Sequence, residues 1–164
     1  MRHSELVSIN CLEFVIIIIS YNAVLDAIDL MDKLRGIPHP KALILADNTA
    51  ADSWTRKIAS SSIIGKALYR ILCALLGNQS AGLDSAHISG TDNDCADNIS
   101  RLTKDLISTI SSLFQKYPKL ASYHRYHPSP ELISLIYSAL LNNLEEVQMP
   151  LMLKGHFVAG KLTL

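Results

Sequence analysis

The feature that most constrains the fold of this chain is a short apolar run, "ALILA", at residues 42–46. The stretch "RGIPHP" precedes it and "DNT" follows it closely. A continuous apolar run between such breakers is typical of a strand that is buried on both faces. The sequence therefore predicts a buried strand at residues 41–46.

Helical patterns flank this strand on both sides. Residues 10–34 keep apolar side chains at helical spacing over six turns, although the β-branched run from Val15 to Ile19 favours a strand by propensity. The predicted elements are, in order, a helix at 10–34, a strand at 41–46, a short helix at 50–58, a helix from the serines at 60–62 to Gly77, a second strand within 82–90, and a helix capped by Asp92 or Asn93. This alternation predicts an α/β layer with parallel strands.

The character of the chain changes after residue 103. Two further helices are expected within 106–120 and 128–147, the second with Ser129 as its cap and Pro130 in its first turn. The basic, aromatic stretch "ASYHRYHPSP" joins them, and the tail from Met149 has no predicted structure. We therefore expect an α/β domain at residues 1–103 and a helical extension at residues 104–164.

Composition narrows the classes of function and compartment. Lys plus Arg equal Asp plus Glu at 15 each, whereas a protein that binds nucleic acid by itself usually has a basic surplus. The three cysteines form no CxxC motif, so we expect reduced thiols in an intracellular protein, cytoplasmic or nuclear. The unbroken apolar run at residues 14–19 is far shorter than the roughly 20 residues of a membrane span, and we expect no membrane association.

Three carboxylates stand at positions that an α/β fold can bring together. Glu13 lies within the first apolar helix, Asp47 ends the first strand, and Asp97 lies in the first turns of a later helix. Ligands commonly bind where strand ends and neighbouring helices meet at one edge of such a sheet. Clustered carboxylates need a positive partner, and Mg²⁺ prefers oxygen ligands. The three residues are thus candidate ligands of a metal site.

Simpler roles stay open for each candidate. Asp47 is also a good N-cap for the next helix, and Asp97 is an acid that would stabilise a helix N-terminus. Glu13 is harder to explain without a partner, because a carboxylate on so apolar a helix is costly to bury alone. The cluster of His124, Arg125, Tyr126 and His127 is either a solvated loop or a small nucleic-acid contact.

Three stretches of the sequence resemble a known family. They are "SINCLEFV", "LILADNTAADSW" and "AHISGTDNDCADNISRL". Together they resemble the C-terminal part of the ribonuclease H domain of reverse-transcribing retroelements, particularly the DIRS and Ngaro-like tyrosine-recombinase type of fungi. The third is the most specific, with Gly90, Asn93, Ala96, Asp97, Ser100 and Arg101 all fitting the family pattern. The resemblance covers about residues 5–103.

The resemblance implies a function and a set of roles. The chain would be a remnant or fragment of a retroelement reverse transcriptase whose ancestral activity is hydrolysis of RNA in RNA–DNA hybrids. Glu13, Asp47 and Asp97 would hold two Mg²⁺ ions, with Mn²⁺ as a substitute. Asn48 and Thr49 would lie beside the site on the substrate side, and Asn93 would support its loop. The partners implied are the RNA–DNA hybrid and the remainder of the reverse transcriptase polyprotein.

The departure from the family pattern has consequences of its own. The family's domain begins with three antiparallel strands, the first of which carries a further aspartate, whereas Met1 here lies just before the first helix. We therefore expect an incomplete ribonuclease H-like fold with weak or no activity. The strand at 41–46 would then present an open, apolar edge.

Two alternatives follow. The chain could be a non-catalytic interaction module that pairs through this edge or through its C-terminal helices. It could also be an unrelated α/β enzyme in which Asp47 is an isolated acid at a strand end.

Overall fold

The structure is a computed structural model, and it describes residues 7–31, 40–57, 62–77, 81–100, 115–118, 122–141 and 153–161. The chain is a mixed α/β protein, as the sequence predicts. It divides into two compact units. The first unit comprises residues 1–87 and 128–156, and the second comprises 88–127 and 157–164. The predicted division at residue 103 stays a prediction, because residues 101–114 lie outside the described part.

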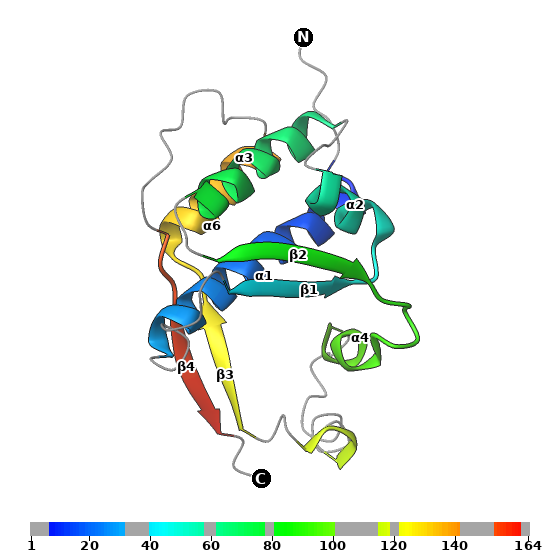
Figure 1. Cartoon of the computed structure of the whole chain (residues 1–164), viewed down its shortest axis with the longest axis vertical. Helices are drawn as coiled ribbons and strands as arrows, with labels where there is room; N and C mark the ends of the chain where they lie inside the picture. The colour runs from blue at the N-terminus through cyan, green and yellow to red at the C-terminus, as the bar shows by residue number, and fades with distance from the viewer. Residues whose placement is uncertain are drawn as a thin grey trace. The chain divides into compact units, whose positions relative to one another are not determined.

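The first unit contains the helices and strands α1 (Ile9–Leu30), β1 (Lys41–Ala46), α2 (Thr49–Lys57), α3 (Ile63–Gly77), β2 (Gly82–His87) and α6 (Pro130–Leu140) (Figure 1). Each matches a predicted element. β1 and β2 are parallel neighbours, with Lys41 opposite Gly82 and Ala46 opposite His87. The predicted parallel pairing of these two strands is confirmed.

Each helix of the first unit begins beside a polar side chain that accepts a hydrogen bond from the backbone of its first turn. The acceptors are Ser8 for α1, Asn48 for α2, Ser62 for α3 and Ser129 for α6. Such caps satisfy N–H groups that have no partner within the helix. The cap of α2 is therefore Asn48, whose Oδ1 accepts from Ala50 N–H at 3.0 Å and Ala51 N–H at 2.9 Å. The N-cap position that the sequence offered to Asp47 is therefore taken by Asn48.

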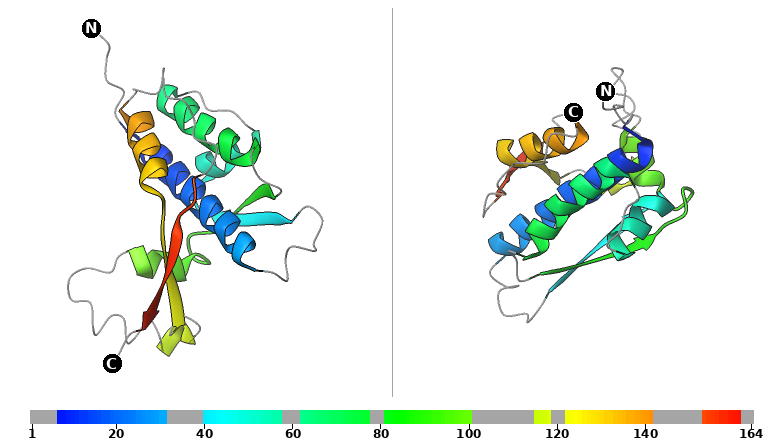
Figure 2. Two further views of the ribbon diagram at one scale, coloured as in Figure 1. Left: turned by 90° about the vertical axis from the view of Figure 1, so that its left-hand side faces the viewer. Right: turned by 90° about the horizontal axis from the view of Figure 1, so that it is seen from above.

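The core of the first unit lies between the sheet and its helices. α1 crosses behind β1 and β2 in Figure 1, and the view from above in Figure 2 places the helices on one side of the two strands. Phe14, Ile18 and Tyr21 of α1 are completely buried, as is Leu68 of α3. Tyr21 also donates its hydroxyl to the carbonyl oxygen of Ala81 at 2.6 Å, which ties α1 to the start of β2.

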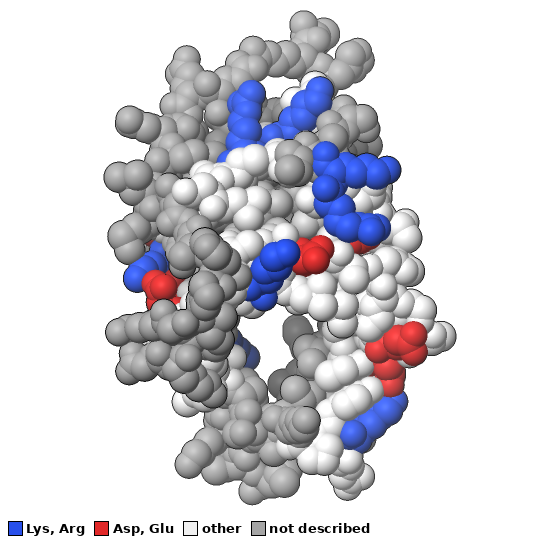
Figure 3. Space-filling model, viewed as in Figure 1, with Lys and Arg blue, Asp and Glu red and all other residues white. Residues whose placement is uncertain are grey.

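The outer face of the sheet corrects one prediction. β1 was expected to be buried on both faces, yet Leu43 is 62% exposed and Leu45 is 54% exposed. Ala42, on the opposite face, is buried. Alternation along a strand sends successive side chains to opposite faces, so only the inner face meets the helices. Figure 3 views this outer face, which over the strands is mostly uncharged.

Helix α1 satisfies the length and composition of a membrane span. It is 22 residues long and contains an 18-residue window with a mean hydropathy of 1.9, so the short unbroken run at 14–19 understated how apolar the helix is. In the structure this helix forms the centre of the first unit, and it also carries the buried polar residues Asn22 and Asp26. Helical core segments of soluble proteins share these properties.

Polar side chains along one side of α1 hold a segment that lies more than a hundred residues away in sequence. Asn22 donates to the carbonyl oxygen of Leu153 (2.9 Å), Asp26 accepts from the N–H of Gly155 (2.8 Å), and Asp29 pairs with Lys154 (2.9 Å). Leu153 is buried in the core beside them. The three side chains of α1 lie at positions i, i+4 and i+7 and so share a helix face. Sequence reasoning missed this attachment of the C-terminal region.

The second unit contains α4 (Asp94–Ser100) and strand β3 (Ser122–His127), and strand β4 (His156–Lys161) pairs with β3. The two strands run in opposite directions in Figure 1, and the rings of Tyr126 and Phe157 lie 5.0 Å apart. Two expectations are corrected here. The stretch expected to be a loop at 121–130 contains β3, and the tail without predicted structure contains β4. Aromatic and β-branched residues such as Tyr126, Phe157 and Val158 favour strands once the two segments have each other as partners.

Candidate functional site

The carboxyl end of β1 meets the first turns of α1. Asn48, directly after Asp47, donates its Nδ2 to the Oδ1 of Asn10 at 3.0 Å. Asn10 and Glu13 are three residues apart on α1 and therefore lie on the same side of that helix. The strand end thus faces the part of α1 that carries Glu13, which places two of the three predicted site acids near each other.

The electrostatics of Glu13 reflect this proximity. Partial burial raises the pKa of the Glu13 carboxyl above its usual value of 4.5, and the negative charge of Asp47 raises it further. A neighbouring carboxylate disfavours ionisation, and the effect is felt only at short range. Glu13 and Asp47 are therefore brought together as a repelling pair, which a cation would relieve.

The raised pKa of Glu13 predicts a pH-dependent effect on stability. Below pH 4.5 the side chain is protonated in both folded and unfolded chains, and as the pH rises through the folded-state pKa its ionisation weakens the folded state. We expect Glu13→Gln to raise the melting temperature at pH 7 and to have no such effect below pH 4.5, measured by thermal unfolding.

The matched control is Glu131→Gln, at an exposed acid in the first turn of α6. This substitution should not stabilise the protein, because Glu131 favours the positive end of its helix. An equal gain from Glu13→Gln at both pH values would contradict the prediction.

The remaining predicted site residues are distributed over both units. Thr49 is the first residue of α2, next to the cap Asn48. Asp97 lies in the first turn of α4, where its N–H donates to the carbonyl oxygen of Asn93 at 3.0 Å. Asp97 and Asn93 belong to the second unit, and Glu13 and Asp47 belong to the first. The three-acid site therefore stays a prediction, of which the structure brings the Glu13–Asp47 half together.

The Glu13–Asp47 half of the predicted site offers ligand atoms that suit a hard cation. Among the described residues, no group of three or more His, Cys, Asp or Glu side chains is close enough to hold a metal ion. The pair of Glu13 and Asp47 nevertheless offers carboxylate oxygens, the ligands that Mg²⁺ and Mn²⁺ prefer, and its mutual repulsion favours an added positive charge.

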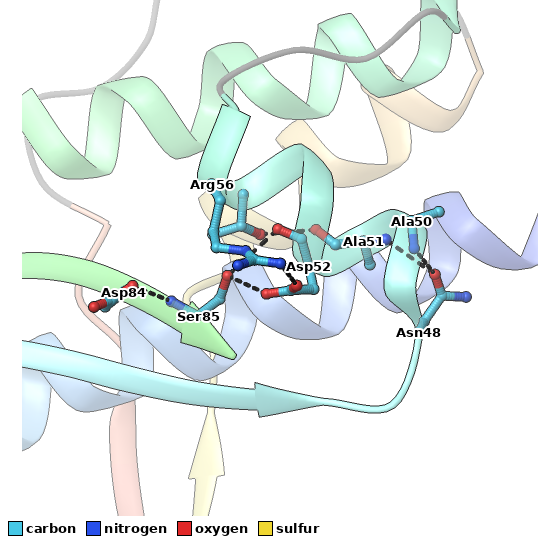
Figure 4. A network of polar contacts seen from close by, with 8 residues as sticks. Asn48, Ala50, Ala51, Asp52, Arg56, Asp84 and Ser85 are labelled. Atoms are coloured by element: carbon cyan, nitrogen blue, oxygen red, sulfur yellow. Dashed lines mark hydrogen bonds and ion pairs between the residues drawn. The ribbon is translucent and has the colours of Figure 1, made fainter. Parts of the chain in front are cut away.

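An ion pair with a buried carboxylate next to the strand ends was not foreseen from the sequence. The carboxylate of Asp52, on α2, is only 1% exposed, and it accepts from Ser85 Oγ at 2.7 Å and from Arg56 at 2.5 Å (Figure 4). Ser85 lies on the inner face of β2. This contact joins α2 to the sheet and so fixes the turn that carries Asp47 and Asn48. The available signal was an acid with the apolar residues Ala50, Ala51 and Trp54 close to it in the sequence.

A basic patch covers α2 and α3. Figure 3 shows Lys and Arg side chains gathered over these helices, and their cations are Arg56, Lys57, Lys66 and Arg70, all exposed. The charged residue of opposite sign on these two helices is Asp52, which is buried. A chain with zero net charge thus has a locally basic surface. Helical spacing of Lys66 and Arg70 was the signal for it.

Comparison with protein-family models, with curated proteins and with solved structures finds no match for this chain.

Proposed function

We propose that this chain is part of a ribonuclease H-like domain of a retroelement reverse transcriptase, with a divalent-cation site at Glu13 and Asp47 and weak or absent cleavage of RNA by itself. The observation that carries the proposal is the contact between the end of β1 and the first turn of α1, where Asn48 Nδ2 donates to Asn10 Oδ1 at 3.0 Å and the negative charge of Asp47 helps to raise the pKa of Glu13. Repelling acids at a strand end are typical of a functional site rather than of a stabilising contact.

The order of elements supports the same proposal. A helix bearing the first acid precedes a strand that ends in the second, and a helical crossover leads to a parallel neighbouring strand. This is the order implied by the resemblance in "SINCLEFV" and "LILADNTAADSW". A bound Mg²⁺ ion would supply charge neutralisation for a phosphodiester at the pair. Glu13 and Asp47 would hold the ion, and Asn48 would fix the strand end through its bond to Asn10.

The basic patch supports a nucleic-acid substrate. Exposed lysines and arginines attract the phosphate backbone independently of sequence. Arg56 lies on the helix that directly follows the strand end and also contacts buried Asp52, so its position is fixed relative to Asp47. A hybrid bound to α2 and α3 would thus lie on the elements that flank the carboxylate pair.

The test is cation binding followed by cleavage. Mg²⁺ or Mn²⁺ should raise the melting temperature of the wild-type chain, because an ion that binds only the folded state stabilises it. Asp47→Asn should remove most of this shift, whereas Asp84→Asn, at an exposed acid on β2, should leave it unchanged. Incubation of the wild-type chain with an RNA–DNA hybrid and Mg²⁺ should give little or no product.

Each of two outcomes would contradict one part of the proposal. A cation-induced shift that survives Asp47→Asn would mean that the pair does not bind the ion. Robust cleavage that Asp47→Asn abolishes would support the site but overturn the expected inactivity.

A further inference from the structure

The free edge of β1 has a sequence that is complementary to itself. Within the described part of the first unit, the sheet has the order β1-β2, so the other edge of β1 has no strand beside it. The strand and the next residue read "KALILAD", residues 41–47. The apolar centre is the same in both directions, and the two ends carry opposite charges. A second copy of this strand, turned by 180°, would therefore meet complementary residues along its whole length.

The hydrogen-bonding direction of β1 fits such a pairing. The N–H of Gly82 on β2 donates to the carbonyl oxygen of Pro40 at 2.9 Å, so Pro40 faces β2. Because backbone groups of successive strand residues point to opposite edges, those of Lys41, Leu43 and Leu45 point to the free edge. These residues are where a new antiparallel strand would bond.

We propose that this edge is a homodimer interface, in which β1 pairs with β1 of a second copy around a two-fold axis at Ile44. In that register Leu43 of each copy lies opposite Leu45 of the other, and these pairs exchange the outward backbone hydrogen bonds. Lys41 of each copy lies opposite Asp47 of the other. The result is one continuous four-stranded sheet with the order β2-β1-β1-β2.

The surface of the sheet favours this occupant over an unrelated strand. Leu43 and Leu45 are 62% and 54% exposed on the outer face. The two-fold axis places Leu43 of one copy against Leu45 of the other across the new strand pair. Directly opposite side chains in antiparallel strands contact each other. Lys41 and Asp47 are both exposed at the ends of the strand, where charge complementarity selects this register. In a register shifted by one residue, backbone groups that point to the free edge would lie opposite groups that point to β2. The hydrogen bonds between the two copies could then not form.

This interface also adds a residue to the candidate site. Asp47 would have the ammonium group of Lys41 of the second copy near its carboxylate, so pairing and cation binding would draw on the same side chain. The inference itself needs neither a metal nor a nucleic acid, and its test uses neither.

Charge reversal tests the register directly, with sedimentation velocity of the full chain over a concentration series at low salt. The wild-type chain should show a monomer–dimer equilibrium. In a dimer of the Lys41→Asp variant two carboxylates would face each other at both ends of the strand pair, and in a dimer of the Asp47→Lys variant two ammonium groups would do so. Each variant alone should therefore dimerise at least about tenfold more weakly than the wild type. An equimolar mixture of the two should recover dimers, because opposite charges then meet at both ends.

Two further variants serve as controls. Asp84→Lys makes the same charge change as Asp47→Lys on β2, away from the free edge, and should dimerise as the wild type does. Leu43→Pro removes an outward N–H but leaves the bonds to β2, so it should stay folded by circular dichroism and remain monomeric. A wild-type chain that is monomeric throughout, or a dimer that neither charge variant weakens, would overturn the proposal, as would failure of the mixture to recover dimers.

Discussion

Phe14→Ala is expected to lower the free energy of unfolding by about 3–5 kcal/mol, the range for removal of a buried aromatic side chain. Phe14 is completely buried on α1. Its ring makes an edge contact with Trp54 at 5.8 Å and stacks on Tyr69 at 6.4 Å between ring centres. The substitution would therefore leave a cavity where α1, α2 and α3 meet. Urea unfolding followed by circular dichroism measures the effect.

The matched control is Ile16→Ala on the same helix. Ile16 is 56% exposed, and substitutions at exposed positions usually change stability by less than about 0.5 kcal/mol. If both variants lost stability equally, the assignment of Phe14 to the buried face of α1 and of Ile16 to its exposed face would be wrong. The comparison also tests whether this apolar helix acts as a core helix in solution.

Asp52→Ala is expected to lower the free energy of unfolding by about 2–3 kcal/mol, because it removes charge-assisted hydrogen bonds and leaves the buried Ser85 hydroxyl without this acceptor. Asp52 is 1% exposed and Ser85 is 4% exposed. Arg56, the other partner, has a side chain that is 58% exposed and stays solvated after the change. The loss should therefore come mainly from the Asp52–Ser85 contact.

A double-mutant cycle separates this contact from general effects. Ser85→Ala combined with Asp52→Ala should cost less than the sum of the single changes, since both remove the same hydrogen bond. Asp84→Ala, at the exposed neighbour of Ser85, should stay within about 0.5 kcal/mol of the wild type. Additive effects of the two buried changes would contradict the assigned contact.

The secondary structure of the first unit was predictable because its local signals agree. Ser129 followed by Pro130 predicts the start of α6, and the breakers around residues 41–46 predict β1 with its observed bounds. β3 was not predictable in the same way. Its residues are polar and aromatic, and they form a strand through pairing with β4, a segment about 30 residues later in the chain. The strand propensity of one segment does not indicate which other segment will pair with it.

The candidate site, too, was in part predictable from the sequence and in part decided by tertiary contacts. The sequence by itself offered Glu13, Asp47 and Asp97 as candidate site acids, from their positions on an apolar helix, at a strand end and in the first turns of a helix, and it determined the alternation of helices and strands. Only the tertiary structure decided that Asn48, not Asp47, caps α2, and that Asp52 is buried against Ser85. It also decided that Leu43 and Leu45 face outward rather than into a second layer. The physical reason is that burial and partner choice depend on what packs against each face, which a strand's own residues do not specify.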